Sequence, residues 1–270
     1  MHLSLTGHKL YNLMAKNWRG CKSESVGLQG AAMSVGRLAL MFAFSPKITA
    51  LPIVGREDRF PVRRVYCVGR NYVAHIREMK EGDERDPPFF FQKPADAVVA
   101  GGADVPYPPQ TEDFQFEAEL VVAIGDTASC IPIERALDVV FGYGVGVDLT
   151  RRDRQRESFK SGLPWEIGKA FDRSAPCGAI HPVATVGHRL TGAISLSVNG
   201  EERQRGDLSQ MIWNTPEIIS NLSKSYRLES GDLIMTGTPA GVGVIVPGDA
   251  LVVSIEGLMP LSFAIGEKEV

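Results

Sequence analysis

The chain has 270 residues, of which 44% are hydrophobic and 23% charged, a balance typical of a globular protein with a substantial core. A net charge of −3 gives no electrostatic footprint for nucleic acid or a membrane surface, and no apolar run is long enough to span a bilayer. The cysteines at positions 21, 67, 130 and 177 lack CxxC spacing, which argues against a zinc finger or a disulfide framework and favours a cytoplasmic location.

Residues 1–45 differ from the rest of the chain. Up to residue 40 they contain five basic residues against the single acid Glu24, and residues 37–46 form a short apolar segment. This segment is compatible with a secretory signal or a targeting presequence, although it is short and has a poor cleavage site. We expect a poorly ordered N-terminal arm over residues 1–45, with Met33 or Met41 as alternative starts, and a folded domain over residues 46–270.

From Arg63 onward the pattern predicts many strands and few helices. A strand that runs into a turn is expected at 63–72. Further strands are expected at 89–94, 114–125, 142–148 and 194–204, and in the segments GDLIMTG, ALVVSIEGL and LSFAIG. Helices are expected at 71–79, before the glycine-rich strand that ends at 148, at 151–160 and near 214–226. Because strands and helices do not alternate regularly, we expect a mixed, β-rich α+β fold rather than a doubly wound sheet.

Two carboxylates interrupt the otherwise core-like stretch FQFEAELVVAIG (114–125). Alternate side chains of a strand share a face, so Glu117 and Glu119 project together while Phe116, Ala118 and Leu120 face the other way. Neighbouring carboxylates repel each other unless a proton or a cation lies between them. A solvated sheet face remains the alternative interpretation.

A third acid follows the stretch GYGVGV (142–147). Gly142, Gly144, Gly146 and Asp148 share one face of the predicted strand, which predicts a cavity floor with a carboxylate at its rim. Close packing of the glycines, with Asp148 as a turn residue, is the alternative. Glu117, Glu119 and Asp148 would form a hard oxygen site without Cys or His, which suits Mg²⁺ best, with Mn²⁺ or Ca²⁺ as alternatives.

Six segments occur in an order that resembles a known family: GRNYVAHIREM, FFFQKP, FEAELVVAIG, GYGVGVDLTRRDRQ, GKAFDRSAPCG and GDLIMTGTPAGVG. Over residues 60–265 the chain resembles the fumarylacetoacetate hydrolase family. PFFFQKPADAVV and LPWEIGKAFDRSAP are most similar to its bacterial fumarylpyruvate hydrolase and acylpyruvase branch.

The resemblance implies a catalytic domain built as a mixed β-sandwich or β-roll with short peripheral helices, which forms a homodimer. It implies that Mg²⁺ is held by Glu117, Glu119 and Asp148. The implied reaction is hydrolysis of a carbon–carbon bond in a 2,4-dioxo acid, foremost fumarylpyruvate to fumarate and pyruvate. An isomerase of dienedioates, an oxaloacetate decarboxylase or a non-catalytic metabolite-binding relative are the alternatives.

The resemblance also implies that His75 and Glu78 activate water. Their i, i+3 spacing places them on one side of a helix, where a carboxylate can orient an imidazole base, although such a pair is often only a surface feature. The polar stretch 79–88 predicts a mobile connection, so this helix is expected to act as a lid.

Six further residues are candidates for binding substrate or stabilising charge. Lys169 and Gln155 match family positions that stabilise an oxyanion, and Lys93 is expected to pair with a substrate carboxylate. Thr238 and the amides of TGTPAGVG (236–243) would hold the pyruvyl carboxylate, unless this loop is a simple turn. Arg70 and Tyr72 are candidates for the distal carboxylate.

The segment after Asp148 carries a helix-start pattern. Thr150 and Asp153 predict a capping box, and a helix that starts there would point its positive end at the metal. The arginines at 151, 152, 154 and 156 are expected to form a solvated helical face. No GxSxG motif occurs, which argues against a serine nucleophile.

Overall fold

The computed structural model describes residues 43–79 and 86–268, and the chain divides into two compact units, Met1–Pro46 and Lys47–Val270. The prediction that residues 1–45 are poorly ordered falls almost wholly outside the described residues, as does most of the connection predicted to be mobile after Met79. Within the described residues, no helix combines the length and the apolar character needed to cross a membrane. The fold below is that of the second unit.

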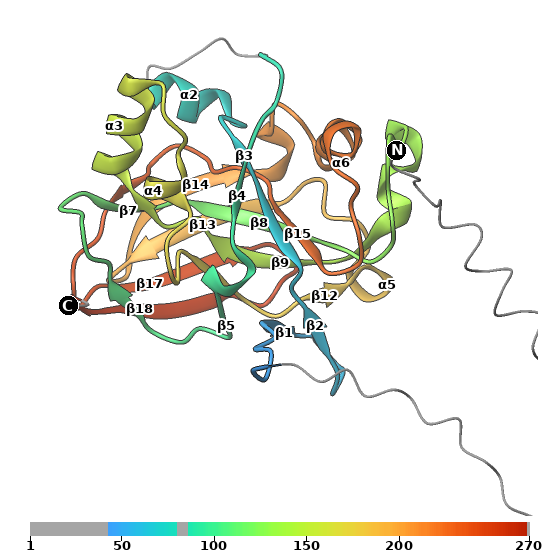
Figure 1. Cartoon of the computed structure of the whole chain (residues 1–270), viewed down its shortest axis with the longest axis horizontal. Helices are drawn as coiled ribbons and strands as arrows, with labels where there is room; N and C mark the ends of the chain where they lie inside the picture. Colours follow the sequence, from blue (N-terminus) through green and yellow to red (C-terminus); the bar gives the residue numbers. More distant parts are fainter. Residues whose placement is uncertain (1–42, 80–85, 269–270) are drawn as a thin grey trace, which may run out of the picture. The chain divides into compact units, whose positions relative to one another are not determined.

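A large mixed sheet forms the centre of this unit (Figure 1). Its strands run in the order β4-β3-β15-β8-β9-β11-β5, and β12 also pairs with β9. The β3–β15 and β5–β11 pairs are parallel, and the other pairs are antiparallel. The strands are β3 (Arg64–Gly69), β4 (Phe89–Lys93), β5 (Val98–Ala100), β8 (Ala118–Ile124), β9 (Val140–Val147), β11 (Ala175–Cys177), β12 (His181–Pro182) and β15 (Asp232–Met235).

Three smaller sheets complete the described strands. A five-stranded sheet has the order β14-β13-β17-β18-β6, a three-stranded sheet has the order β10-β7-β16, and β1 pairs with β2. Their strands are β1 (Ala50–Pro52), β2 (Arg59–Pro61), β6 (Val105–Tyr107), β7 (Phe114–Phe116), β10 (Thr150–Arg151), β13 (Ala193–Val198), β14 (Glu201–Asp207), β16 (Gly243–Val244), β17 (Ala250–Ile255) and β18 (Leu261–Lys268).

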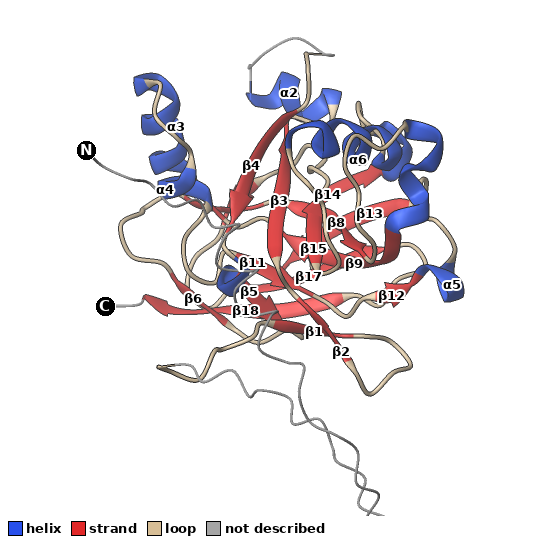
Figure 2. Cartoon of the chain, turned by 45° about the vertical axis from the view of Figure 1, so that its right-hand side comes forward, coloured by secondary structure: helices blue, strands red, loops and turns tan. Residues whose placement is uncertain are grey.

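The helices are short and lie around the sheets (Figure 2). The α-helices are α2 (Val73–Met79), α3 (Arg152–Ser161), α4 (Glu166–Lys169), α5 (Val183–Val186) and α6 (Thr215–Ser225). The 3₁₀ helices are η1 (Ala95–Ala97), η2 (Ile133–Val139) and η3 (Leu208–Gln210), and η2 takes the place of the helix predicted before the glycine-rich strand. Helix α6 begins at a capping box, in which Asn214 and Glu217 exchange side-chain and backbone hydrogen bonds.

Strand β8 is buried along its whole length because a hydrophobic cluster covers each of its faces. Leu120 and Val122 pack in the larger cluster with apolar residues of the five-stranded sheet. Val121 and Ala123 pack in a second cluster with residues of β1 and β2. The predicted alternation along this strand is therefore confirmed, and so is the β-rich α+β fold.

The predicted strand 114–125 is interrupted at Glu117. Strand β7 ends at Phe116 and pairs with β10 and β16, whereas β8 starts at Ala118 and pairs with β9 and β15. Glu117 therefore lies where the chain passes from the three-stranded sheet into the large sheet. Phe116, before it, pairs with Gly243 of β16, and Ala118, after it, pairs with Val147 of β9. These two pairings hold the glutamate at the junction.

The prediction of one strand over residues 194–204 was wrong. The segment is a hairpin of β13 and β14, and its turn is Asn199–Gly200. Both turn residues have positive φ, 52° and 82°, which is the geometry that an Asn-Gly pair favours in a two-residue hairpin. Strand β14 therefore returns along β13 and carries Gln204 back toward the large sheet.

The predicted capping box at Thr150 and Asp153 was also wrong. Helix α3 begins at Arg152, and no side chain caps its first turn. Thr150 belongs to β10 instead, where its hydroxyl donates to the carbonyl of Asp148. The Asp153 carboxylate accepts bonds from the Thr111 hydroxyl and the Glu112 amide, so it fastens α3 to the loop before β7.

The glycines of β9 do not form a cavity floor. A Cβ atom on Gly142 would lie 2.3 Å from the carbonyl oxygen of His181, and one on Gly146 would lie 2.6 Å from Val121 Cγ2. These glycines therefore allow β9 to pack against its neighbours, which was the alternative interpretation. Only Asp148, just beyond the strand, reaches the candidate site.

Candidate active site

Three buried carboxylates meet at the junction of β7, β8 and β9. Pairing of β8 with β9 places Glu119 opposite Gly146, and the Asp148 amide donates to the carbonyl of Glu117 over 2.8 Å. One carboxylate oxygen from each of Glu117, Glu119 and Asp148 lies within 4.8 Å of the other two. All three side chains are buried, so the solvated-face interpretation was wrong.

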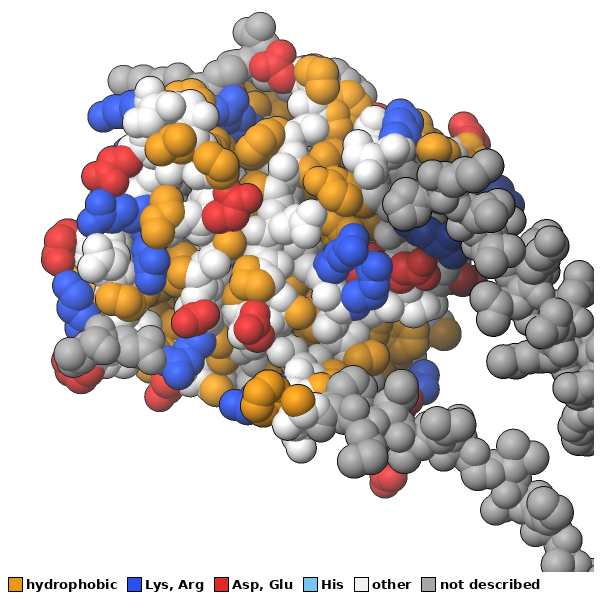
Figure 3. All heavy atoms as spheres, in the orientation of Figure 1, with side chains coloured by type: hydrophobic (Ala, Val, Ile, Leu, Met, Phe, Trp, Pro, Cys, Tyr) orange, Lys and Arg blue, Asp and Glu red, His pale blue; other side chains and the backbone are white. Residues whose placement is uncertain are grey.

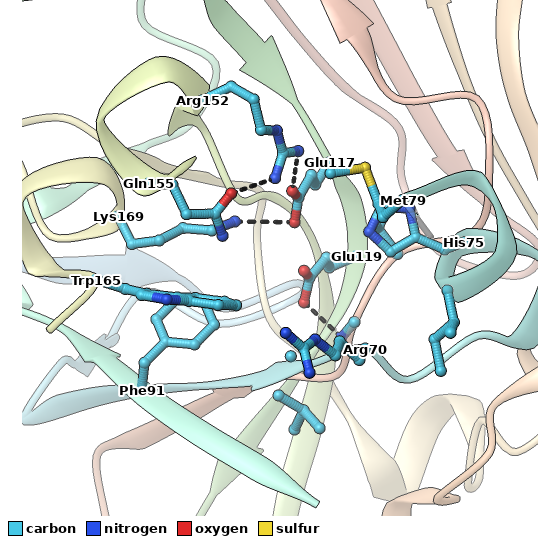
Figure 4. Close-up of a pocket in the computed structure, with 15 residues that line it drawn as sticks. Arg70, His75, Met79, Phe91, Glu117, Glu119, Arg152, Gln155, Trp165 and Lys169 are labelled. Carbon is cyan, nitrogen blue, oxygen red and sulfur yellow. Dashed lines mark hydrogen bonds and ion pairs between the residues drawn. The ribbon is translucent and has the colours of Figure 1, made fainter. Parts of the chain in front are cut away.

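Buried cations partly balance this acidic cluster. Lys169 Nζ lies 2.9 Å from Glu117 Oε2 and 2.8 Å from Asp148 Oδ2, and it also donates to the Thr150 hydroxyl. Arg152 donates through Nη2 to Glu117 Oε1 (Figure 4). Lys169 therefore lies at the predicted site, and it touches two carboxylates of the cluster.

Lys93 does not have the position predicted for it. Its ammonium group lies 2.8 Å from Asp148 Oδ1 and donates to the main-chain carbonyls of Leu149 and Lys169. The side chain is enclosed and is not among the residues that line the cavity of the acidic cluster. Lys93 therefore contacts Asp148 and main-chain carbonyls rather than this cavity.

The two glutamates have opposite pKa shifts. Burial opposes the ionisation of Glu117, but the charges of Lys169 and Arg152 outweigh it, so the pKa of Glu117 lies below its ordinary value. Burial raises the pKa of Glu119, the charges of Asp148 and Glu117 raise it further, and the hydrogen bond from Gly237 only partly opposes them. A cation among the three carboxylates would stabilise the ionised form of Glu119.

The donor set fits a divalent metal ion. It consists of carboxylate oxygens without sulfur or imidazole, it is buried, and one oxygen of each carboxylate lies within 4.8 Å of the others. Hard cations such as Mg²⁺ and Mn²⁺ prefer oxygen ligands of this kind and keep other positions for water or substrate. Glu117, Glu119 and Asp148 are therefore the residues that would hold such an ion.

His75 and Glu78 lie on one side of α2, as their spacing predicts. His75 Nδ1 is 3.3 Å from Glu78 Oε2, and the imidazole lines the cavity across from Lys169 and Gln155 (Figure 4). The hydrogen bond from His75 is the main cause that lowers the pKa of Glu78. The pair is thus a positioned imidazole–carboxylate pair and faces the carboxylate cluster.

The loop TGTPAGVG connects the two parts of the site. The Gly237 amide donates to Glu119 Oε2 over 2.6 Å, and the Gly241 amide donates to the Glu78 carboxylate over 3.2 Å. Thr238 lines the cavity between these two contacts. The loop predicted to bind anions therefore binds two of the protein's own carboxylates and exposes Thr238 to the cavity.

The cavity has a polar inner end and an aromatic outer wall. Its volume is about 40 Å³. Phe91 and Trp165 line the outer wall, and Arg70 lies beside them with its guanidinium carbon 5.9 Å from the centre of the Trp165 ring (Figure 4). Arg70 has a positive φ of 60°, which is uncommon for a residue other than glycine.

Tyr72 does not line this cavity, contrary to the prediction. It forms a backbone bridge with Met211, and its ring is buried in the larger hydrophobic cluster. Burial raises the pKa of its hydroxyl above the ordinary value. Tyr72 is therefore a core residue and is not placed to bind a distal carboxylate.

Arg152 is the functional residue that the sequence interpretation missed. Of the four arginines predicted to form a solvated face, Arg156 is exposed, but Arg152 is only 2% exposed and bonds Gln115, Glu117 and Gln155. The signal was its i, i+3 spacing to Gln155, which places both residues on one face of α3.

On the face seen in Figure 3, the exposed basic and acidic side chains are interspersed.

The fold and the site together define an α+β protein with a three-carboxylate centre of the kind that binds a divalent metal. The family described as fumarylacetoacetate (FAA) hydrolase C-terminal matches residues 64–265. The chain belongs to the fumarylacetoacetate hydrolase family, and the mixed sheets with short helices match the fold of that domain.

Individual relatives carry different activities. The fumarylpyruvate hydrolase of Ralstonia sp is 41% identical over 181 residues, which cover 67% of this chain and 94% of the relative. The human mitochondrial oxaloacetate tautomerase FAHD1 is 39% identical over 207 residues, which cover 77% and 93%. A crystal structure of fumarylpyruvate hydrolase from Pseudomonas aeruginosa, in complex with Mn²⁺ and pyruvate, has a TM-score of 0.82 and 51% identity, and the match covers 84% of this chain and all of the other (100%).

Proposed function

We propose that this protein is a divalent-metal-dependent hydrolase that cleaves a carbon–carbon bond in 2,4-dioxo acids, with fumarylpyruvate as its substrate and fumarate and pyruvate as products. The observation that carries the proposal is the His75–Glu78 pair, which faces the three-carboxylate cluster across one cavity. The Ralstonia and Pseudomonas relatives support the choice of substrate.

The proposed ion is Mg²⁺ or Mn²⁺, held by Glu117, Glu119 and Asp148. When bound, it would polarise the 2-oxo acid end of the substrate and stabilise negative charge there. The structure of the Pseudomonas relative is a complex with Mn²⁺ and pyruvate, which supports the choice of a divalent ion and of a pyruvyl group as ligand.

The His75–Glu78 pair supplies the base. Glu78 engages Nδ1 of His75, which leaves Nε2 to take a proton from water. The resulting hydroxide adds to the 4-carbonyl carbon, and the bond between C3 and C4 then breaks. The electron pair leaves with C3 as the enolate of pyruvate, which takes up a proton, and the acyl group leaves as a carboxylic acid.

Gln155 and Lys169 stabilise the negative charge on the attacked carbonyl. The Gln155 oxygen accepts a hydrogen bond from Arg152 over 2.6 Å, which fixes the amide so that its NH₂ group is left to donate. Lys169 adds a buried positive charge beside it. Donors that are in place before the reaction need little reorganisation when the oxyanion forms.

Arg70 is the proposed partner for the distal carboxylate of the substrate. It lies on the outer part of the cavity wall beside Phe91 and Trp165, whose flat faces suit the conjugated acyl chain of fumarylpyruvate. This position favours a longer dianionic substrate over oxaloacetate. Oxaloacetate tautomerisation is the second candidate because of the human relative.

The test is pyruvate release from fumarylpyruvate, measured with lactate dehydrogenase after treatment with EDTA and again after addition of Mg²⁺ or Mn²⁺. We expect activity only with the ion, and a loss of about 100-fold or more in kcat for His75→Asn. His188→Asn is the matched control, because His188 is exposed and bonds Tyr143 away from the cavity. If oxaloacetate tautomerises rapidly and no pyruvate is released from fumarylpyruvate, the proposal is wrong.

The homodimer expected from the family resemblance stays a prediction.

A further inference from the structure

Gln204 is a fully buried polar residue that no sequence motif singled out. It lies on β14, and its side-chain oxygen accepts a hydrogen bond from the Ala118 amide over 2.9 Å. Its side-chain nitrogen donates to the Pro239 carbonyl and to the Thr238 hydroxyl oxygen, each over 2.8 Å. One amide thus connects the main chain between the two glutamates with the TGTPAGVG loop.

The orientation of this amide is fixed by its main-chain partners. The Ala118 N–H group can only donate, so it requires the Gln204 oxygen. The Pro239 carbonyl can only accept, so it requires the Gln204 NH₂ group. If the amide were flipped, its NH₂ group would face the Ala118 N–H group and its oxygen would face the Pro239 carbonyl. Neither pair could form a hydrogen bond, so buried polar groups would be left unpaired.

This orientation determines what the Thr238 hydroxyl can do. Its oxygen already accepts a hydrogen from Gln204, so its own hydrogen must point elsewhere. Thr238 lines the cavity, and among the described residues no acceptor for this hydrogen is found. The hydroxyl is therefore a donor toward the cavity, beside Glu119 and the Gly237 amide.

The loop is also seated firmly on β14. A Cβ atom on Gly241 would lie 2.1 Å from the Arg203 carbonyl oxygen, and one on Gly206 would lie 2.8 Å from Pro239 Cβ. The loop thus packs closely against β14 on both sides of Gln204. The hydrogen bond from Gln204 to Thr238 lies within this close contact.

We propose that Gln204 is a positioning residue for substrate: its amide orients the Thr238 hydroxyl as a hydrogen-bond donor to the carboxylate at the pyruvyl end. The inference rests on the proposed function, because it takes a 2-oxo acid as the ligand of this end of the cavity. Gln204 itself does not line the cavity and acts through Thr238.

The experiment measures pyruvate binding to the Mn²⁺-loaded protein by titration calorimetry, with Mn²⁺ affinity measured separately. The variants are Gln204→Met, Thr238→Val, their double variant and Thr238→Ser. A lost hydrogen bond to a charged group is expected to raise the Kd of pyruvate about 10-fold or more in each of the first two. Asn221→Leu is the control, since it removes a side-chain hydrogen bond on α6.

Three results support the inference together. The double variant binds pyruvate no more weakly than Thr238→Val, Thr238→Ser regains most of the affinity lost in Thr238→Val, and Mn²⁺ affinity changes by less than the pyruvate affinity. Additive losses in the double variant, or an unchanged Kd in Gln204→Met, would overturn it. Should Gln204→Met fail to fold, an unchanged Kd in Thr238→Val overturns it and a loss restored in Thr238→Ser supports it. Wild-type protein that does not bind pyruvate refutes the proposed function instead.

Discussion

Lys169 Nζ lies 2.8 Å from Asp148 Oδ2, so a buried ammonium group already contacts the acidic cluster that is proposed to hold a metal ion. The Asp148 carboxylate has two oxygens, and Lys93 lies against the other one at 2.8 Å. These two ammonium groups balance part of the negative charge of the cluster without an ion. A divalent cation then adds positive charge, which favours an anionic substrate.

Removal of Asp148 tests the metal centre. Asp148→Asn is expected to lower Mn²⁺ affinity by at least about 100-fold, more than is typical when a supporting group is lost, because a ligand oxygen is replaced. Calorimetric titration of the EDTA-treated protein measures this. Asp58→Asn is the matched control, since Asp58 is exposed and pairs with Arg56 away from the cluster. Equal affinity in Asp148→Asn and the control would show that the ion binds elsewhere.

Replacement of Lys169 tests charge compensation. Lys169→Met leaves Glu117 and Asp148 without their shared cation, and breaking a buried pair in this way costs about 3–5 kcal/mol. We expect a large loss of unfolding free energy in EDTA and a much smaller loss with saturating Mn²⁺, because the ion supplies positive charge. Urea unfolding with and without Mn²⁺ measures both. A loss of the same size in both conditions contradicts this account.

Arg70 tests the choice of acyl group. Arg70→Met keeps a long side chain on the cavity wall but removes the charge, so KM for fumarylpyruvate is expected to rise about 10-fold or more. KM for acetylpyruvate, which lacks the distal carboxylate, is expected to stay within about threefold. Steady-state kinetics on both substrates measure the difference. A similar rise for both substrates would mean that Arg70 does not contact the distal carboxylate.

Asp153 is expected to make the free energy of unfolding fall as the pH is lowered. Burial opposes its ionisation, but hydrogen bonds from the Thr111 hydroxyl and from backbone amides outweigh it, so the pKa of Asp153 is lowered in the folded protein. Its contribution to stability is therefore present above the unfolded pKa of about 3.9 and is lost as the pH falls through the folded pKa. Asp153→Asn should be less stable than wild type at pH 7.

The difference between Asp153→Asn and wild type should shrink when urea unfolding is repeated near pH 3. Other carboxylates titrate in this range too, but they do so in both proteins, so the difference isolates Asp153. Asp126→Asn is the control, because Asp126 is exposed and its carboxylate accepts a hydrogen bond from the amide of the next residue, Thr127. A difference that grows toward low pH would contradict the lowered pKa.

The sequence by itself determined the local geometry of the site. Alternation along a strand places Glu117 and Glu119 on one side, and the helical i, i+3 spacing places His75 beside Glu78. These relationships are set within a few residues by the backbone period, so they follow from sequence order alone. The ordered motifs determined the family in the same way.

Only the tertiary structure decided which charges these carboxylates meet. Arg152 points inward from α3, where it bonds Gln115 and Glu117. Lys93, the last residue of β4, contacts Asp148 and the Leu149 carbonyl, which are more than 50 residues away in the sequence. Gln204 reaches the site because the Asn199–Gly200 turn brings β14 back beside the loop. Such contacts join residues distant in sequence, and a single side chain's surroundings depend on every element packed around it.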